Sequence, residues 1–157
     1  MNEFCAKKLG EVLAFASVSL DTAKQGNKAM TVILGDSGLA DFIDNNEKQI
    51  ETINQIAAEY EVTDIVNKKL AGTGEKLKKM RDLYIGDEWD NPTELLEWSG
   101  FFEGAAIVHW QLVIGISRGL SNNTIDDLAQ KTLTFRKALF TLVEKKLNEF
   151  GEAKSQL

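Results

Sequence analysis

Three of the ionisable side chains in the most apolar long segment of this chain, residues 91–118, are its first candidates for chemistry. They are Glu97, Glu103 and His109, and His109 is the only histidine in the sequence. Buried ionisable groups are costly unless they are paired, so a glutamate and a histidine in such a segment indicate a possible functional site. Their spacing of six residues opposes one shared metal ion, because successive side chains would be separated by about 9 Å along a helix and rotated by about 120°.

Two interpretations of these residues are open. In the first, Glu103 and His109 are core groups that are satisfied by hydrogen bonds. In the second, Glu103 and His109 bind iron, manganese or zinc, or a small ligand is held by Glu97, Glu103, His109 and the two tryptophans of the segment, Trp98 and Trp110. A metal site of this kind would make the protein similar to the ferritin-like di-iron bundles, which carry a Glu-x-x-His pair on each of two helices. This chain has no such pair, so we expect no cofactor.

A short motif points to a different chemistry. Residues 32–37 read VILGDS and resemble the nucleophile block of GDSL-type esterases. That family supplies its base from a late Asp-x-x-His motif, which takes the proton of the serine hydroxyl. In this chain the residue three positions before His109 is Ala106. A turn in which Ser37 caps the next helix is therefore the preferred interpretation, and the sequence offers no complete catalytic constellation.

The segment that carries Glu103 and His109 has the end signals of one long helix. Asn91 can cap it, Pro92 suits its first position, and Gly119 can close it. Its apolar side chains spread around the whole helical circumference, which is typical of a helix surrounded by protein or lipid. Glu103 and His109 interrupt its apolar run, and the part after Glu103, residues 104–116, is shorter than the roughly 20 residues that span a bilayer. We therefore predict a central buried helix over about residues 93–118 and no membrane partner.

Small residues gather on one side of this predicted helix. Gly100, Gly104, Gln111 and Gly115 fall within a sector of about 60° on a helical wheel. Each glycine destabilises a helix by roughly 1 kcal/mol relative to alanine, so three on one side predict the close approach of another backbone.

The rest of the chain also has the pattern of helices. Apolar residues recur at helical spacing in four further regions. These four regions are residues 2–25, 47–60, 64–85 and a last helix after residue 123. Two short segments lie between the first and the second: residues 28–34, whose β-branched run fits a strand or a buried turn of helix and is predicted as helix, and a helix at 37–43. Ser37 can cap the helix at 37–43, and Asn46 can cap the one at 47–60. Residues 86–90 form a linker. The sequence thus predicts an all-α, single-domain, up-and-down bundle of five or six helices over residues 1–157.

Charge is unevenly distributed between two neighbouring parts of the chain. Residues 36–64 contain eight acids and one lysine, whereas residues 66–81 contain six bases and one acid. Opposite charges on adjacent helices attract, so we expect these two blocks to neutralise each other across a helical hairpin.

Composition narrows the classes of partner. The net charge of −6 disfavours nucleic acid and anionic membranes, which both bind clustered positive charge. A lone cysteine, Cys5, and a charged stretch over residues 2–10 favour a cytoplasmic protein. We expect a protein that is not an enzyme and that binds a protein partner or itself, as a homo-oligomer, through faces near Trp89 and Trp98. The alternative is a bundle with an interior metal or ligand site.

Overall fold

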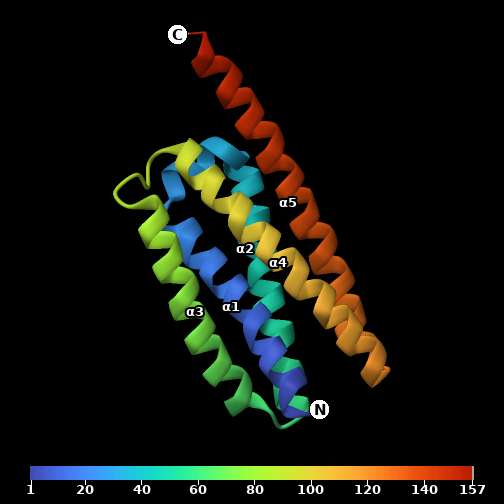
Figure 1. Cartoon of the computed structure of the whole chain (residues 1–157). Coiled ribbons are helices and arrows are strands. Elements are labelled where there is room, and N and C mark those ends of the chain that lie inside the picture. The colour runs from blue at the N-terminus through green and yellow to red at the C-terminus, as the bar shows by residue number, and fades with distance from the viewer. Residues whose placement is uncertain (157) are drawn as a thin grey trace.

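Residues 1–156 of the computed structural model are described here, and they form a bundle of five helices. The helices are α1 (Glu3–Gln25), α2 (Asn27–Glu59), α3 (Thr63–Ile85), α4 (Pro92–Leu120) and α5 (Asn123–Ser155). Successive helices run in opposite directions, and the last turns of α5 extend past the ends of the others (Figure 1). The prediction of an all-α, single-domain, up-and-down bundle is confirmed.

Three of the five helices begin at an asparagine whose side chain caps them. Asn2, Asn91 and Asn122 accept hydrogen bonds from the backbone N–H groups of Cys5, Thr93 and Ile125, respectively. Pro92 follows Asn91 as the first residue of α4, where its missing N–H group has no effect on the helix. These local signals explain why the predicted bounds of α1, α4 and α5 lie within a few residues of those observed.

The α2 helix is longer than the sequence predicts. It runs from Asn27 to Glu59 with one kink, at Gly35, whose φ of 72° and ψ of 168° are strained for any residue with a side chain. The predicted break before Asn46 is wrong. Asn46 lies inside the helix, where its Nδ2 donates to the Phe42 carbonyl at 2.8 Å. Its side chain is fully buried, so tertiary contacts, not capping, explain the asparagine.

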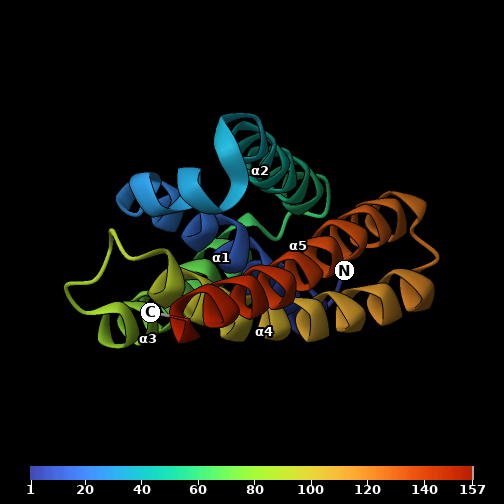
Figure 2. The same cartoon turned by 90° about the horizontal axis from the view of Figure 1, so that it is seen from above.

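The helix with the most central position is α1. Most of its residues are buried, and it packs against α3 and α2 and also touches α4. Viewed from above, α1 lies between α2 on one side and α3 and α4 on the other (Figure 2). By contrast, α4 is buried on one side only, since Phe101 and Val108 are 65% and 62% exposed. The prediction that α4 is a central helix buried on all sides is therefore wrong.

Length and composition alone would allow α4 to cross a bilayer, and it is the one helix of residues 1–156 with this property. In the bundle its main neighbour is α5.

A close approach of two helices occurs at Gly10, not on α4. A Cβ atom at Gly10 would lie 2.5 Å from the Val66 carbonyl oxygen and 2.7 Å from Lys69 Cβ of α3. The nearest atoms to such a Cβ at Gly100 and Gly104 belong to α5 side chains at 3.8 Å, which is ordinary van der Waals contact. The predicted backbone approach at the α4 glycines is therefore wrong, and α1 needs its glycine to pack on α3.

Two lysines and the arginine of α3 form ion pairs with α1 instead of α2. Lys69 lies 3.0 Å from Glu11, and Lys78 and Arg81 lie 3.3 and 2.6 Å from Asp21. Because α3 packs mainly on α1 and touches α2 little, the predicted neutralisation between α2 and α3 is corrected.

Candidate functional site

Arg136 of α5 lies at the centre of a polar cluster inside the bundle. Its side chain is fully buried. Nη1 donates to Glu103 Oε1 at 2.9 Å and to Ser19 Oγ at 3.2 Å, and Nη2 donates to Asn46 Oδ1 at 2.7 Å and Gln49 Oε1 at 3.3 Å. These five residues, here named the Arg136 cluster, connect α1, α2, α4 and α5 through one guanidinium.

The Arg136 cluster lies where two apolar clusters of the core meet. Along α5, one apolar cluster ends at Leu133 and the other includes Val143, and Arg136 falls between them. Along α2, Asn46 and Gln49 likewise fall between Phe42 and Ile53. The positions of these polar side chains on the inner faces of their helices bring them together at this junction.

The ion pair between Glu103 and Arg136 is buried on both sides. Burial raises the pKa of the Glu103 carboxyl above its ordinary value and outweighs the charge and the hydrogen bond of Arg136, which act to lower it. Glu103 Oε2 and Arg136 Nε have no hydrogen-bond partner among residues 1–156. A buried polar atom without a partner destabilises a protein by about 1–3 kcal/mol. Oε2 is therefore a free acceptor inside the bundle.

Glu103 also lines a small cavity of about 40 Å³ between α2, α4 and α5. The walls are mainly apolar and include Met30, Ile33, Trp98 and Leu142. Of the five residues that the sequence offers as ligand-binding, the structure thus brings two together, Glu103 and Trp98.

Glu97 and Trp110 lie apart from this cavity. Glu97 is exposed on α4, and its Oε2 accepts a hydrogen bond from Tyr84 Oη at 2.8 Å. Trp110 is fully buried in the other apolar cluster, and its Nε1 has no hydrogen-bond partner among the described residues. The five predicted residues therefore do not form one site.

His109 faces a different carboxylate from Glu103. Its Nδ1 lies 2.7 Å from the Ala105 carbonyl, which favours the tautomer with the proton on Nδ1, and its Nε2 lies 3.8 Å from Glu11 Oε2. Within residues 1–156, no group of three His, Cys, Asp or Glu side chains could hold a metal ion. Glu103 and His109 therefore contact different partners, Arg136 and Glu11, and the structure does not bring these two residues of the metal alternative together.

The Glu11 carboxylate lies close to three basic side chains, those of Lys8, Lys69 and His109. Lys8 and Lys69 lie 2.9 and 3.0 Å from its carboxylate. Burial raises the pKa of Glu11, but the hydrogen bonds and charges of the two lysines outweigh it and leave the pKa below the ordinary value. This cluster is thus an ionised surface network between α1, α3 and α4.

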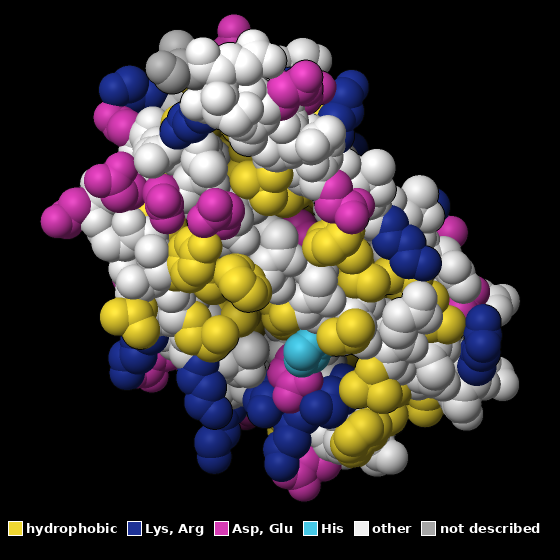
Figure 3. All heavy atoms as spheres, turned by 45° about the horizontal axis from the view of Figure 1, so that its top comes forward, with side chains coloured by type: hydrophobic (Ala, Val, Ile, Leu, Met, Phe, Trp, Pro, Cys, Tyr) yellow, Lys and Arg dark blue, Asp and Glu magenta, His cyan; other side chains and the backbone are white. Residues whose placement is uncertain are grey.

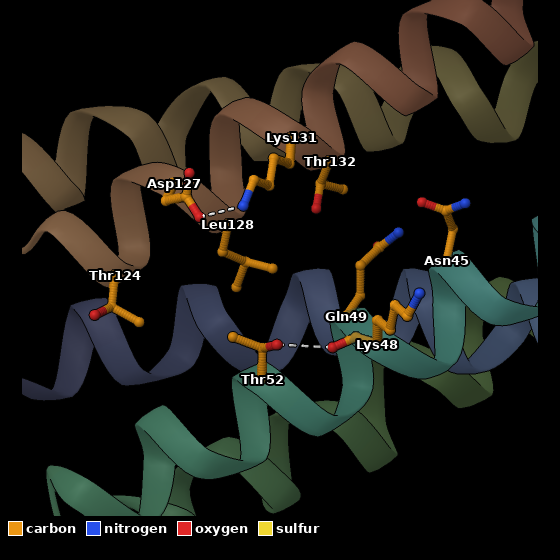
Figure 4. A pocket seen from close by; sticks show the side chains of 9 residues that line it. All are labelled: Asn45, Lys48, Gln49, Thr52, Thr124, Asp127, Leu128, Lys131 and Thr132. Carbon is orange, nitrogen blue, oxygen red and sulfur yellow. Dashed lines mark hydrogen bonds and ion pairs between the residues drawn. The ribbon is translucent and has the colours of Figure 1, made fainter.

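A polar groove of about 310 Å³ runs between α2 and α5. Figure 4 shows Gln49 between the two helices, with Lys48 on one side and Lys131 on the other. Lys48 is paired with Asp44 and Lys131 with Asp127, both at 2.6 Å and both within one helix. Both lysines are thus neutralised locally, and Gln49 connects the groove to the Arg136 cluster.

An exposed apolar feature lies on α3, α4 and α5. A shallow groove of about 460 Å³, here named the α4–α5 groove, is lined by Tyr84, Phe101, Phe140, Val143 and Leu147 together with Gly100, Glu97 and Glu144. The rings of Tyr84 and Phe101 meet edge to face with centroids 5.4 Å apart. On the adjoining surface of α3, Leu83 and Met80 are 88% and 59% exposed. Figure 3 shows hydrophobic side chains gathered on this side of the molecule.

Sequence reasoning missed Arg136, Asn46 and Gln49. Arg136 stands three residues after Leu133 and seven before Val143, so it occupies a position on the apolar face of α5. An arginine on such a face is the signal that could have indicated a buried partner. No local signal identifies Glu103 as that partner.

No protein-family model, curated protein or solved structure matches this chain. The geometry and charge of the structure leave two candidate sites: the α4–α5 groove at the surface and the cavity beside Glu103 in the interior.

Proposed function

We propose that the protein is not an enzyme and works by self-association through the apolar face that α3, α4 and α5 expose. The observation that carries this proposal is the exposure of Phe101, 65% of whose surface meets solvent next to Tyr84. Contiguous exposed apolar surface on a folded domain is typical of an interaction site. The Trp98 side chain is itself buried, but its ring packs against the ring of Tyr84, with centroids 6.3 Å apart.

The shape of the α4–α5 groove suits a helix of a partner. Its lining combines the small Gly100 and the aliphatic Val143 with the aromatic rings of Tyr84, Phe101 and Phe140. Aromatic anchors in such grooves contribute most of the binding energy at protein interfaces. An apolar side chain from a second molecule would lie between Phe101 and Phe140.

The charges on this face favour a second copy as the occupant. Glu97 and Glu144 line the groove, while Lys8 and Lys69 surround Glu11 farther along the same face. Figure 3 shows carboxylates at one edge of the apolar surface and basic side chains beside the histidine at the other. A two-fold axis through the apolar surface would place the acidic edge of one copy over the basic edge of its partner, because a two-fold interface pairs each residue with its opposite.

Sedimentation velocity over a range of protein concentrations tests the proposal. The unmodified chain should form a dimer, and Phe101→Ser should raise the dissociation constant at least tenfold. Val32→Ser is the matched control, because Val32 is also an exposed apolar residue, 60% exposed, but lies on α2. A chain that stays monomeric at every concentration, or equal effects of both substitutions, would overturn the proposal.

A further inference from the structure

We infer that the cavity beside Glu103 is a binding site for a small apolar molecule that carries one hydroxyl group. The cavity is formed inside one copy of the bundle, so this inference does not depend on self-association. Two observations carry it: the cavity has mainly apolar walls, and it is lined by Glu103, which is only 4% exposed and whose Oε2 lacks a partner among residues 1–156.

The polar atoms around the cavity require a ligand that donates a hydrogen bond. Ser99 Oγ donates to the Leu95 carbonyl at 2.6 Å, and Thr22 Oγ1 donates to the Val18 carbonyl at 2.8 Å. The hydroxyl protons of Ser99 and Thr22 therefore already have acceptors within the protein. Glu103 Oε2 is an acceptor as well, so a ligand with only acceptor atoms would gain no hydrogen bond in this cavity.

The buried ion pair between Glu103 and Arg136 favours a ligand that carries no charge. Arg136 already compensates the charge of Glu103 at 2.9 Å. A cationic ligand would add a second positive charge to a buried pair that is neutral as a whole, and an unpaired buried charge is strongly unfavourable. A neutral hydroxyl group supplies the missing donor without this penalty.

The volume sets the size of the ligand. A cavity needs roughly 10–15 Å³ to hold one water, and an engineered apolar cavity of about 150 Å³ holds benzene. The 40 Å³ beside Glu103 is about a quarter of that volume, so in the observed conformation it holds only a molecule of one or two heavy atoms, such as methanol. A larger molecule would have to displace a wall.

One wall of the cavity is suited to such a displacement. Met30, Ile33 and Leu34 come from the first part of α2, residues 27–34, which lies between Gly26 and the kink at Gly35. Both ends of this short segment interrupt the regular helix, so it can shift with little loss of helical hydrogen bonds. Longer alcohols should then bind with shifts of residues 27–34.

The test is a titration of the whole chain with 1-propanol, followed by nuclear magnetic resonance of the Trp98 indole and the methyl groups of Leu96 and Leu142. 1-Chloropropane is the matched probe, since it has a similar shape and no donor. We expect saturable shifts at these three residues and a dissociation constant for 1-propanol at least tenfold below that for 1-chloropropane, because a hydrogen bond to a charged group contributes this much.

Two variants locate the site. Ile33→Phe fills the cavity without touching the carboxylate and should abolish the shifts, whereas Val32→Phe, at the exposed neighbouring position, should leave them unchanged. Glu103→Gln should remove the preference for 1-propanol over 1-chloropropane. Should this variant fail to fold, the Ile33 and Val32 pair still decides the question. Absent or non-saturable shifts, equal affinity for the two probes, or binding that survives Ile33→Phe would overturn the inference.

Discussion

Arg136 and Glu103 are separated by 33 positions in the chain and lie on different helices, yet they form a buried ion pair at 2.9 Å. Arg136 also donates hydrogen bonds to the side chains of Ser19, Asn46 and Gln49. A single guanidinium therefore defines how α1, α2, α4 and α5 fit together at the junction of the two apolar clusters. Removing either charge should affect the whole bundle.

Replacing one member of the pair should be more damaging than replacing both. Arg136→Met leaves the Glu103 carboxylate buried without its partner, which should lower the free energy of unfolding by about 3–5 kcal/mol. The double variant Arg136→Met with Glu103→Leu removes both charges and should recover a large part of that loss. Urea denaturation of the single and double variants measures the difference. Equal or additive losses would show that the pair is not coupled.

Two glycines of helical segments should respond to alanine in opposite directions. Gly10→Ala places a Cβ atom 2.5 Å from the Val66 carbonyl oxygen, so α1 and α3 must separate and the midpoint of thermal unfolding should fall. At Gly72 in α3, no heavy atom of the described residues lies within 4 Å of the added Cβ. Gly72→Ala should therefore stabilise the protein by about 0.5–1 kcal/mol through helix propensity alone. Unfolding temperatures that change in the same direction would contradict the close approach at Gly10.

The pair between Asp21 and Arg81 should contribute to the acid sensitivity of the protein. Burial raises the pKa of Asp21, but the hydrogen bonds and charges of Arg81 and Lys78 outweigh it and hold the pKa below the ordinary value of 3.8. A carboxyl with a lowered pKa stabilises the fold above the unfolded-state pKa, and this contribution is lost as the pH falls through the folded-state pKa.

Asp21→Asn should therefore lower the unfolding free energy at pH 7 and have much less effect near pH 2. Asp36→Asn, at an exposed position of α2, serves as the control and should change the stability by less than about 0.5 kcal/mol at either pH. A loss at Asp21 that does not vary with pH would mean that the carboxylate charge is unimportant there.

Some elements could be predicted well because their signals are local. Asn91 and Pro92 fix the start of α4, and Asn122 caps α5 through the N–H group of Ile125. The break at Asn46 was predicted wrongly for the same reason: asparagine is a good cap, and nothing near it in sequence reveals the Arg136 guanidinium that it binds. Of the five residues that the sequence offers as a site, Glu103 and Trp98 line one cavity, whereas His109 contacts Glu11.

The sequence by itself determined the helical class, the starts of the capped helices and the linker between α3 and α4, because periodicity, caps and turn residues act within a few positions. Only the tertiary structure decided that α1 and not α4 is central, that Lys69, Lys78 and Arg81 of α3 pair with α1, and that Arg136 contacts Glu103. These outcomes depend on which helix faces are brought together. Many pairings bury similar apolar area, and the contacts that select one of them join residues that are far apart in the chain.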